Sequence, residues 1–266
     1  MSDMQVVTSR DNPYAKRLDL LIRQKKARKE SGLFVLEGVR LCLDAMSAGL
    51  RPQSVALTQR VLQKNSELAD FVRVAPQTVW LDEQLAERLG ETKTPQGVFA
   101  IFEAPVSPTV ELSPTGRYLL LHQVREPGNL GCILRTAAAL GASAVFLNEC
   151  AELYAPKTLR AGMGGIFRLP VVEVSNMHQQ ICALRRAGVE VFAAALHRDA
   201  LPPACLAGPG GRAVVIGNEA TGLPEQLITA CDAALAIPMQ GGSESLNAAV
   251  AAGILLWEML GDENDD

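Results

Sequence analysis

Five polar side chains in the C-terminal half of the chain stand in or just after turns that join a strand-like run to a helix-like run. Asn129 follows "VREPG", Arg135 comes six residues later, Glu219 lies in "GNEATG", and Ser245 and Asn247 follow "MQGG". All three turns contain glycine, which lets a ligand approach the backbone and its N–H groups. Such turns suit a polar ligand that lies against backbone with a reacting group held nearby.

Several other chemistries lack their sequence patterns. The chain has no G-x-x-x-x-G-K-[ST] phosphate loop and no G-x-G-x-x-G after a strand; "GMGGIF" at 162–167 is only a near miss. "GGSES" at 241–245 is not a nucleophile elbow, because Ser245 stands where the last glycine must be. His122, His178 and His197 show no metal-ligand spacing, so we expect no metal site.

Length and composition are those of a globular protein with about two domains, since 266 residues with 48% hydrophobic and 20% charged residues can bury two cores. The six cysteines are scattered without a C-x-x-C pair, which indicates reduced thiols. The N-terminus lacks the apolar region of a signal peptide, and no run approaches the roughly 18 apolar residues of a membrane span. We therefore predict a cytoplasmic protein without membrane contact.

Charge is distributed unevenly, although the net charge is only −4. Residues 10–30 contain eight Lys or Arg against Asp11, Asp19 and Glu30, and residues 262–266 contain four acids. A local basic segment can attract the phosphates of a nucleic acid. A solvated helix face would explain the same residues, and this segment alone does not separate the two.

The N-terminal part reads as mixed α and β structure. Residues 14–29 have helical spacing, 33–36 read as a strand followed by a helix to Ala48, and further strands are predicted at 54–58, 72–76 and 97–103. Residues 104–116 contain three prolines and little periodicity, so they are predicted to be a linker.

The C-terminal part alternates apolar strands with helices, which is typical of a parallel sheet covered on both faces. Ligands of such α/β folds bind outside the carboxyl ends of strands, so the turns after residues 124, 216 and 237 are the places to search. The predicted strands are 118–124, 144–148, 171–174, 190–195, 213–216 and 234–237, with helices at 130–141 and 176–187 among others.

Three stretches in these turns carry a family resemblance. "NLGCILRTA" (129–137), "IGNEATGL" (216–223) and "IPMQGGSESLN" (237–247) resemble, in order and spacing, motifs one, two and three of the SpoU/TrmH family of the SPOUT superfamily. "PKTLRAGMGGIFRLPV" (156–171) agrees with the family, and "FVLEGVRLCLDA" (34–45) resembles its small ribosomal-protein-like RNA-binding module. The departures are few: Glu126 replaces a usual Asp, Gly162 a usual Ser, and "NAAVAAG" the commoner "NVSVA".

The resemblance implies an S-adenosylmethionine-dependent RNA ribose 2′-O-methyltransferase that works as a homodimer. It implies a C-terminal α/β domain tied in a deep trefoil knot, where the pattern alone would predict an unknotted doubly wound sheet. The predicted organisation is an N-terminal α/β RNA-binding domain at 1–103, a linker at 104–116, the knotted methyltransferase domain at 117–261 and an acidic tail at 262–266.

The resemblance also assigns roles to residues. It places Gly217, Ile237, Met239 and Leu246 against the cofactor. The predicted catalytic residues are Arg135, Asn129, Glu219, Ser245 and Asn247. Since a guanidinium stays charged, we expect Arg135 to stabilise the developing alkoxide or a phosphate, and leave the proton acceptor open.

The substrate is predicted to be ribosomal RNA rather than tRNA, because a separate N-terminal RNA-binding module accompanies the catalytic domain. Two alternatives stay open: a tRNA 2′-O-methyltransferase, and a non-catalytic RNA- or ribosome-binding protein with the same fold. An oxidoreductase on an ordinary dinucleotide-binding sheet lacks its glycine pattern. The predicted RNA contacts are Arg23, Lys25, Lys26, Arg28, Lys157 and Arg160.

Overall fold

The computed structural model describes residues 6–92, 94–240 and 246–260. The chain divides into two compact units, one of Met1–Pro105 with Tyr154–Phe167 and one of Val106–Leu153 with Arg168–Asp266. This grouping sets residues 154–167 apart from the rest of the predicted 117–261 range, and the predicted domain boundaries themselves stay a prediction. No helix in the described ranges is long and apolar enough to cross a lipid bilayer.

The first unit is built on a five-stranded mixed sheet of order β1-β4-β3-β5-β2. β5 runs antiparallel to both of its neighbours, and the other pairs are parallel. The strands are β1 (Val6–Val7), β2 (Leu33–Glu37), β3 (Pro52–Leu57), β4 (Thr78–Leu81) and β5 (Val98–Glu103).

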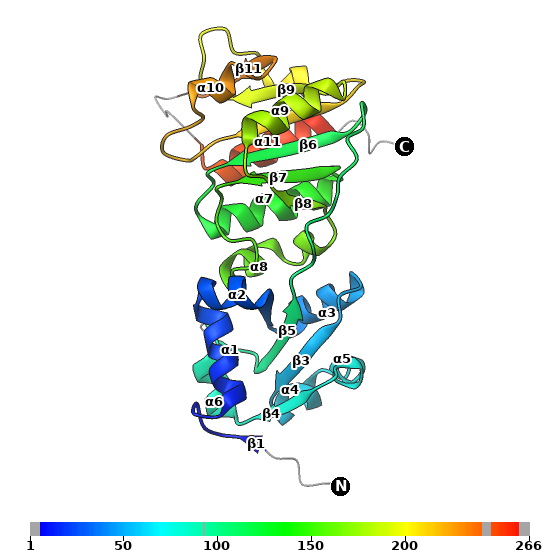
Figure 1. Cartoon of the computed structure of the whole chain (residues 1–266), viewed down its shortest axis with the longest axis vertical. Helices are drawn as coiled ribbons and strands as arrows, with labels where there is room; N and C mark the ends of the chain where they lie inside the picture. The colour runs from blue at the N-terminus through cyan, green and yellow to red at the C-terminus, as the bar shows by residue number, and fades with distance from the viewer. Residues whose placement is uncertain (1–5, 93, 241–245, 261–266) are drawn as a thin grey trace. The chain divides into compact units, whose positions relative to one another are not determined.

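Helices pack against this sheet (Figure 1). Buried side chains of α1 and α6 join Val35, Phe99 and Ile101 in one apolar cluster. Because side chains alternate along a strand, Phe34 and Phe102 point to the other face, where Phe71 of α5 and the 154–167 segment meet them. The helices are α1 (Pro13–Arg23), α2 (Lys25–Ser31), α3 (Val39–Ser47), α4 (Gln59–Lys64), α5 (Leu68–Val74) and α6 (Glu83–Leu89).

Two local predictions for this unit were wrong. The predicted strand at 72–76 belongs largely to helix α5, because Leu68 and Phe71, spaced three apart, are both fully buried, and this burial outweighs the alternating valines. The predicted helix at 14–29 is two helices, because Gln24 is extended and ends α1.

The 154–167 segment forms α8 (Pro156–Gly162) and a 3-10 turn (Gly165–Phe167) within the first unit. The Phe34 ring stacks on Tyr154 with centroids 4.8 Å apart and on Phe167 with centroids 6.2 Å apart. These rings cover one face of β2, so the segment completes the apolar core there.

The second unit contains a six-stranded sheet of order β11-β9-β10-β6-β7-β8, in which every pair is parallel. This confirms the predicted parallel α/β sheet. From β6 the chain continues outward through β7 and β8, whereas β10 lies on the other side of β6. The carboxyl ends of β6 and β10 therefore flank the switch point where α/β folds bind ligands. The strands are β6 (Arg117–His122), β7 (Ala144–Asn148), β8 (Val171–Glu173), β9 (Glu190–Ala194), β10 (Arg212–Ile216) and β11 (Ala233–Leu235).

Helices cover the second sheet as well. α9 (Met177–Arg186) and α10 (Glu225–Ile228) contribute to an apolar cluster with one face of the sheet. α11 (Ala248–Leu260) packs against β10 and α7 (Pro127–Leu140). The long α7 begins directly after β6, which places its first turn at the switch point.

Candidate active site

A polar cavity of about 600 Å³ lies at the carboxyl ends of β6 and β10. The loop after β6 and the first turn of α7 supply one wall, and the loop after β10 supplies another. The two residues immediately before α11, Leu246 and Asn247, close it. Its lining consists of Arg125, Glu126, Asn129, Asn218, Glu219, Ala220, Leu246 and Asn247.

A chain of side-chain hydrogen bonds joins three of the predicted catalytic residues. Asn129 Nδ2 donates to Glu219 Oε1 over 2.8 Å, and Asn247 Nδ2 donates to Asn129 Oδ1 over 3.1 Å. Asn247 Oδ1 in turn accepts from the backbone N–H of Ala249 over 2.9 Å at the start of α11. Asn129 is thus held from both ends of its amide, which fixes the position of the Glu219 carboxylate.

Asn129 does not cap helix α7, although the predicted helix at 130–141 would have placed it immediately before the first helical residue. The helix begins at Pro127, two residues before Asn129, and the Glu126 side chain accepts from the Gly128 N–H. Proline is favoured at the first helical position because its fixed φ suits the helix. This shift frees the Asn129 side chain for Glu219 and Asn247.

The loop after β10 is closed by Asn218. Its backbone exchanges two hydrogen bonds with Gly222, and its Oδ1 accepts from the N–H groups of Ala220 and Thr221. Its Nδ2 donates to Gln123 O, which ties this loop to the end of β6. A Cβ on Gly217 would lie 2.5 Å from the Gly222 carbonyl, so the loop requires glycine at 217.

A second, mostly apolar cavity of about 610 Å³ adjoins the polar one, and Asn218, Glu219, Ala220 and Leu246 line both. It lies outside the carboxyl ends of β9, β10 and β11, and Leu196, Leu235 and Leu255 contribute to its walls. The four predicted cofactor residues all line it: Gly217, Ile237, Met239 and Leu246.

Two predicted catalytic residues are not placed in this arrangement. Arg135 is exposed on α7 and lines neither cavity among the described residues. Six residues after Asn129 it is turned by about 240° around the helix, so it points to a different side. Ser245 lies outside the described residues.

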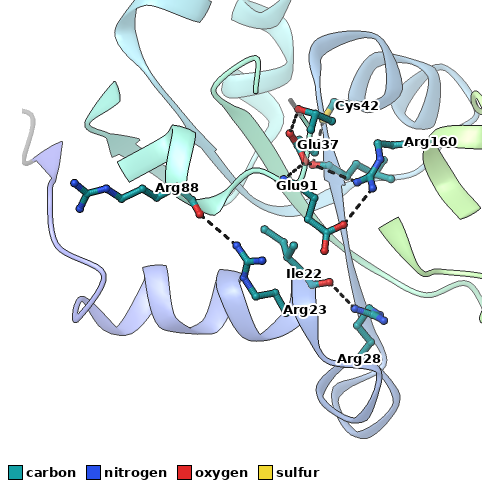
Figure 2. Close-up of polar contacts among 10 residues, drawn as sticks. Ile22, Arg23, Arg28, Glu37, Cys42, Arg88, Glu91 and Arg160 are labelled. Carbon is teal, nitrogen blue, oxygen red and sulfur yellow. Dashed lines mark hydrogen bonds and ion pairs between the residues drawn. The ribbon is translucent and has the colours of Figure 1, made fainter. Parts of the chain in front are cut away.

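Three predicted RNA contacts of the first unit have internal partners, which Figure 2 shows. Arg28 is buried and its guanidinium donates to the carbonyls of Leu21 and Ile22 at the end of α1. Arg23 pairs with Asp19 at 2.9 Å and donates to Arg88 O. Arg160 approaches the carboxylates of Glu91 at 3.2 Å and Glu37 at 3.9 Å.

The three predicted lysines lie at the surface. Lys25, Lys26 and Lys157 are exposed. Lys26 lies 3.8 Å from Glu30, a loose pair at the surface. The structure therefore leaves Lys25 and Lys26 as accessible cations of the segment that the sequence singled out.

Sequence reasoning missed Arg125, Glu126 and Asn218 as members of the site. Asn218 has a visible signal, since an asparagine after a strand and before a glycine-containing turn is suited to close the turn with its side chain. Arg125 has none, because a lone arginine in the turn after a strand carries no local structural demand.

Other reactive groups lie outside the cavities. Burial raises the pKa of the Cys150 thiol to about 11 and that of Cys231 to about 12, so both are protonated near neutral pH. All six cysteines are free. Among the described residues, no three His, Cys, Asp or Glu side chains gather into a possible metal site.

Comparison with known proteins decides what kind of protein carries this site. Residues 116–257, which include both cavities, match the SpoU rRNA methylase family. The chain belongs to the SpoU rRNA methylase family. Residues 12–100 match the MRM3-like substrate binding domain, so the predicted resemblance is confirmed for both parts of the chain.

Relatives of this SpoU chain cover nearly all of it. It is 32% identical over 242 residues to the 23S rRNA (guanosine(2553)-2′-O)-methyltransferase RlmP of Bacillus subtilis, covering 90% of this chain and 93% of that protein. It is 31% identical to the 23S rRNA (uridine(2479)-2′-O)-methyltransferase of Streptomyces viridochromogenes, covering 96% and 91%. A solved structure, an AdoMet-bound rRNA methyltransferase from Sinorhizobium meliloti, is 32% identical with a TM-score of 0.83, covering 96% and 97%.

Proposed function

We propose that the protein is an S-adenosylmethionine-dependent methyltransferase that methylates a ribose 2′-hydroxyl in ribosomal RNA. The observation that carries this is the Asn129–Glu219–Asn247 network in a polar cavity that shares walls with a larger apolar one. Relatives over almost the whole length are rRNA 2′-O-methyltransferases, which supports the same reaction and substrate class.

The apolar cavity fits the cofactor. Small and apolar residues on three strand ends form its walls, and Gly217 leaves its lining free of a side chain there. An adenosyl group needs apolar walls with a few polar backbone groups, which is what such a cavity offers. Gly217, Ile237, Met239 and Leu246 would hold the cofactor, which when bound supplies an electrophilic methyl group on sulfur.

The polar cavity would hold the ribose. A hydroxyl is a weak nucleophile, so the protein must fix it in line with the methyl group and favour its deprotonated form. A carboxylate accepts through both oxygens, so Glu219 keeps acceptor capacity for the hydroxyl after Oε1 has accepted from Asn129. Asn129 and Asn247 act by keeping Glu219 in place.

A homodimer would complete this site. Arg135 is exposed on the stripe of α7 that also presents Cys132 and Ala139, away from its own chain's cavity. On α11, which packs on α7, Val250 and Trp257 are 52% and 61% exposed and lie seven residues apart on one face. An exposed apolar face of this kind beside α7 is suited to bind a second copy of the chain. In such a dimer, Arg135 of one chain would lie near Asn129 and Glu219 of the other.

The N-terminal domain at 1–103 would select the RNA, with Lys25 and Lys26 of α2 among the phosphate contacts. The exposed Lys157 and the half-buried Arg160 of α8 belong to the same compact unit and would also contact the RNA. To do so, Arg160 would give up its ion pair with Glu91 and bind an RNA phosphate in its place.

The trefoil knot is also part of the proposal. β11 is an edge strand of the sheet. The next helix in the chain, α11, packs against α7 and against β10, which is an inner strand. Residues 241–245, which lie between β11 and α11 in the sequence, are outside the described residues. The six free thiols support a reducing, cytoplasmic location.

The test is methyl transfer from labelled S-adenosylmethionine to ribosomal RNA and to tRNA, each isolated from cells that lack the protein. We expect incorporation into rRNA, with a new 2′-O-methyl site found by mapping. Incorporation into tRNA alone would redirect the substrate assignment. Cofactor binding by calorimetry without incorporation into either RNA would favour a non-catalytic binding role.

A further inference from the structure

The chemistry of RNA places a demand on the polar cavity. In a nucleotide the 2′-hydroxyl and the 3′-phosphate stand on neighbouring ribose carbons. A ribose whose 2′-oxygen reaches Glu219 therefore brings a phosphate to the rim of the same cavity. This inference rests on the proposed function.

The cavity wall contains two carboxylates, Glu126 and Glu219, that would repel this phosphate. Among the described residues that line it, Arg125 is the cation. Arg135 of the same chain is not in the lining, so it does not offset these charges in its own cavity.

The backbone at Arg125 is anchored while its side chain is accessible. Val124 is fully buried, and its carbonyl accepts from the Ala151 N–H over 2.8 Å. Arg125 itself is exposed, and within the described part of the chain its guanidinium has no ion pair or hydrogen bond. A guanidinium presents paired N–H donors that match two phosphate oxygens.

We propose that Arg125 is the RNA phosphate clamp of the active site, binding the phosphate next to the ribose that is methylated. It acts within its own chain and differs in this from Arg135. Its charge offsets Glu126 and Glu219, so that the ribose can approach the carboxylate that positions it.

The experiment compares Arg125→Gln, Arg125→Lys and the control Arg186→Gln in the full-length protein. Arg186 is an exposed arginine at the end of α9, four residues before β9 begins, so it lies near the amino end of that strand, whereas the cavity lies at the carboxyl ends. The readouts are kcat/KM on total ribosomal RNA from cells lacking the protein, filter binding of that RNA across salt concentrations, and calorimetric binding of S-adenosylmethionine.

For Arg125→Gln we expect kcat/KM to fall roughly 10- to 100-fold, because charge-assisted hydrogen bonds are removed. The slope of log affinity against log salt should become less steep by about 0.7, the value for one phosphate on single-stranded RNA that is no longer neutralised. Arg125→Lys should restore the slope and part of the rate. The Arg125 variants should bind S-adenosylmethionine with wild-type affinity, and Arg186→Gln should match the wild type in all three measurements.

Rates and salt slopes for Arg125→Gln equal to those of Arg186→Gln would overturn the proposal. So would a fall in rate that comes with weakened cofactor binding and an unchanged salt slope, because that combination marks a structural role. If the wild-type protein transfers no methyl group, the proposed function fails, and RNA filter binding still tests Arg125 by itself.

Discussion

Asn129 and Glu219 are 90 residues apart in the chain, and the amide of one donates to the carboxylate of the other over 2.8 Å. The contact exists because β6 and β10 are neighbours and parallel, so the turns that follow them open at the same edge of the sheet. Asn247 joins them from the start of α11, which makes the site a meeting of three segments.

Asn129 and Glu219 are expected to act as one unit. Asn129→Ala and Glu219→Ala should each lower methyl transfer strongly, and the double variant should lose little more than either single one. Asn129→Asp should be worse than Asn129→Ala, because it sets two carboxylates against each other. Single-turnover rates in a double-mutant cycle measure this, and additive losses would show that the two residues act independently.

Arg135 is expected to serve the partner's site. Arg135→Ala and Asn129→Ala should each be nearly inactive, with cofactor affinity unchanged for Arg135→Ala. If the sites are shared across a symmetric dimer, mixing the two variants should restore about a quarter of wild-type activity, since half the dimers then hold one intact site.

The mixture is prepared by co-expression with two different tags. No recovery in purified mixed dimers would place Arg135 in its own chain's site. A fully active monomer in light scattering would reject the dimer.

Substitutions of neighbouring basic residues in the first unit should affect different properties, RNA binding in one case and stability in the other. Lys25→Glu with Lys26→Glu should weaken RNA binding and reduce its salt slope by about 0.7 for each phosphate that is no longer bound, without changing stability. Arg28→Met should instead lower the free energy of unfolding by about 3 kcal/mol, because the Leu21 and Ile22 carbonyls lose a buried charged donor. Urea unfolding measures the loss of stability, and filter binding measures the loss of RNA affinity. If both variants bind RNA as the wild type does, this segment is a solvated helix face that does not contact RNA.

Phe34 should be critical for the first unit. Phe34→Ala is expected to cost about 3–5 kcal/mol, because the ring is fully buried between Phe102, Tyr154 and Phe167. Tyr154→Ala should cost less, since Tyr154 is partly exposed. Urea denaturation followed by tyrosine and tryptophan fluorescence gives both values, and a destabilisation below about 1 kcal/mol for Phe34→Ala would contradict the packing described.

Alkaline pH should destabilise the fold through its buried thiols. Burial raises the pKa of Cys150 to about 11 and of Cys231 to about 12, and it raises the pKa of Cys42 further. At a pH between the ordinary pKa of a thiol and these raised pKa values, the unfolded chain has lost thiol protons that the folded chain still holds. The free energy of unfolding therefore falls as the pH rises above about 9. Each thiol contributes about 1.4 kcal/mol per pH unit in that range.

Urea midpoints from about pH 8 to about pH 10.5 measure this fall. Cys150→Ser should flatten the curve, whereas replacing the exposed Cys132 should leave it as it is. An identical pH profile for wild type and Cys150→Ser would contradict the contribution of Cys150.

The sequence by itself determined the parallel α/β sheet, the three turns, and Asn129, Glu219 and Asn247 as residues of the site. The strands β6, β7, β8, β9, β10 and β11 fall within a few residues of the predicted runs because buried parallel strands are continuously apolar. Gly217 and Asn218 are needed locally, one because a Cβ would collide with Gly222 and the other because it closes its own turn. Local demands of this kind are written in local sequence.

Only the tertiary structure decided which side chains meet. The order β11-β9-β10-β6-β7-β8 brings Glu219 to Asn129 and adds Arg125 to the cavity, and the turn of α7 directs Arg135 elsewhere. The burial of Arg28 and the helix at Leu68–Val74 also depend on what packs against them. Charge and hydropathy describe a residue, whereas its availability to RNA or to a neighbour is set by the surface that surrounds it, and distant segments build that surface.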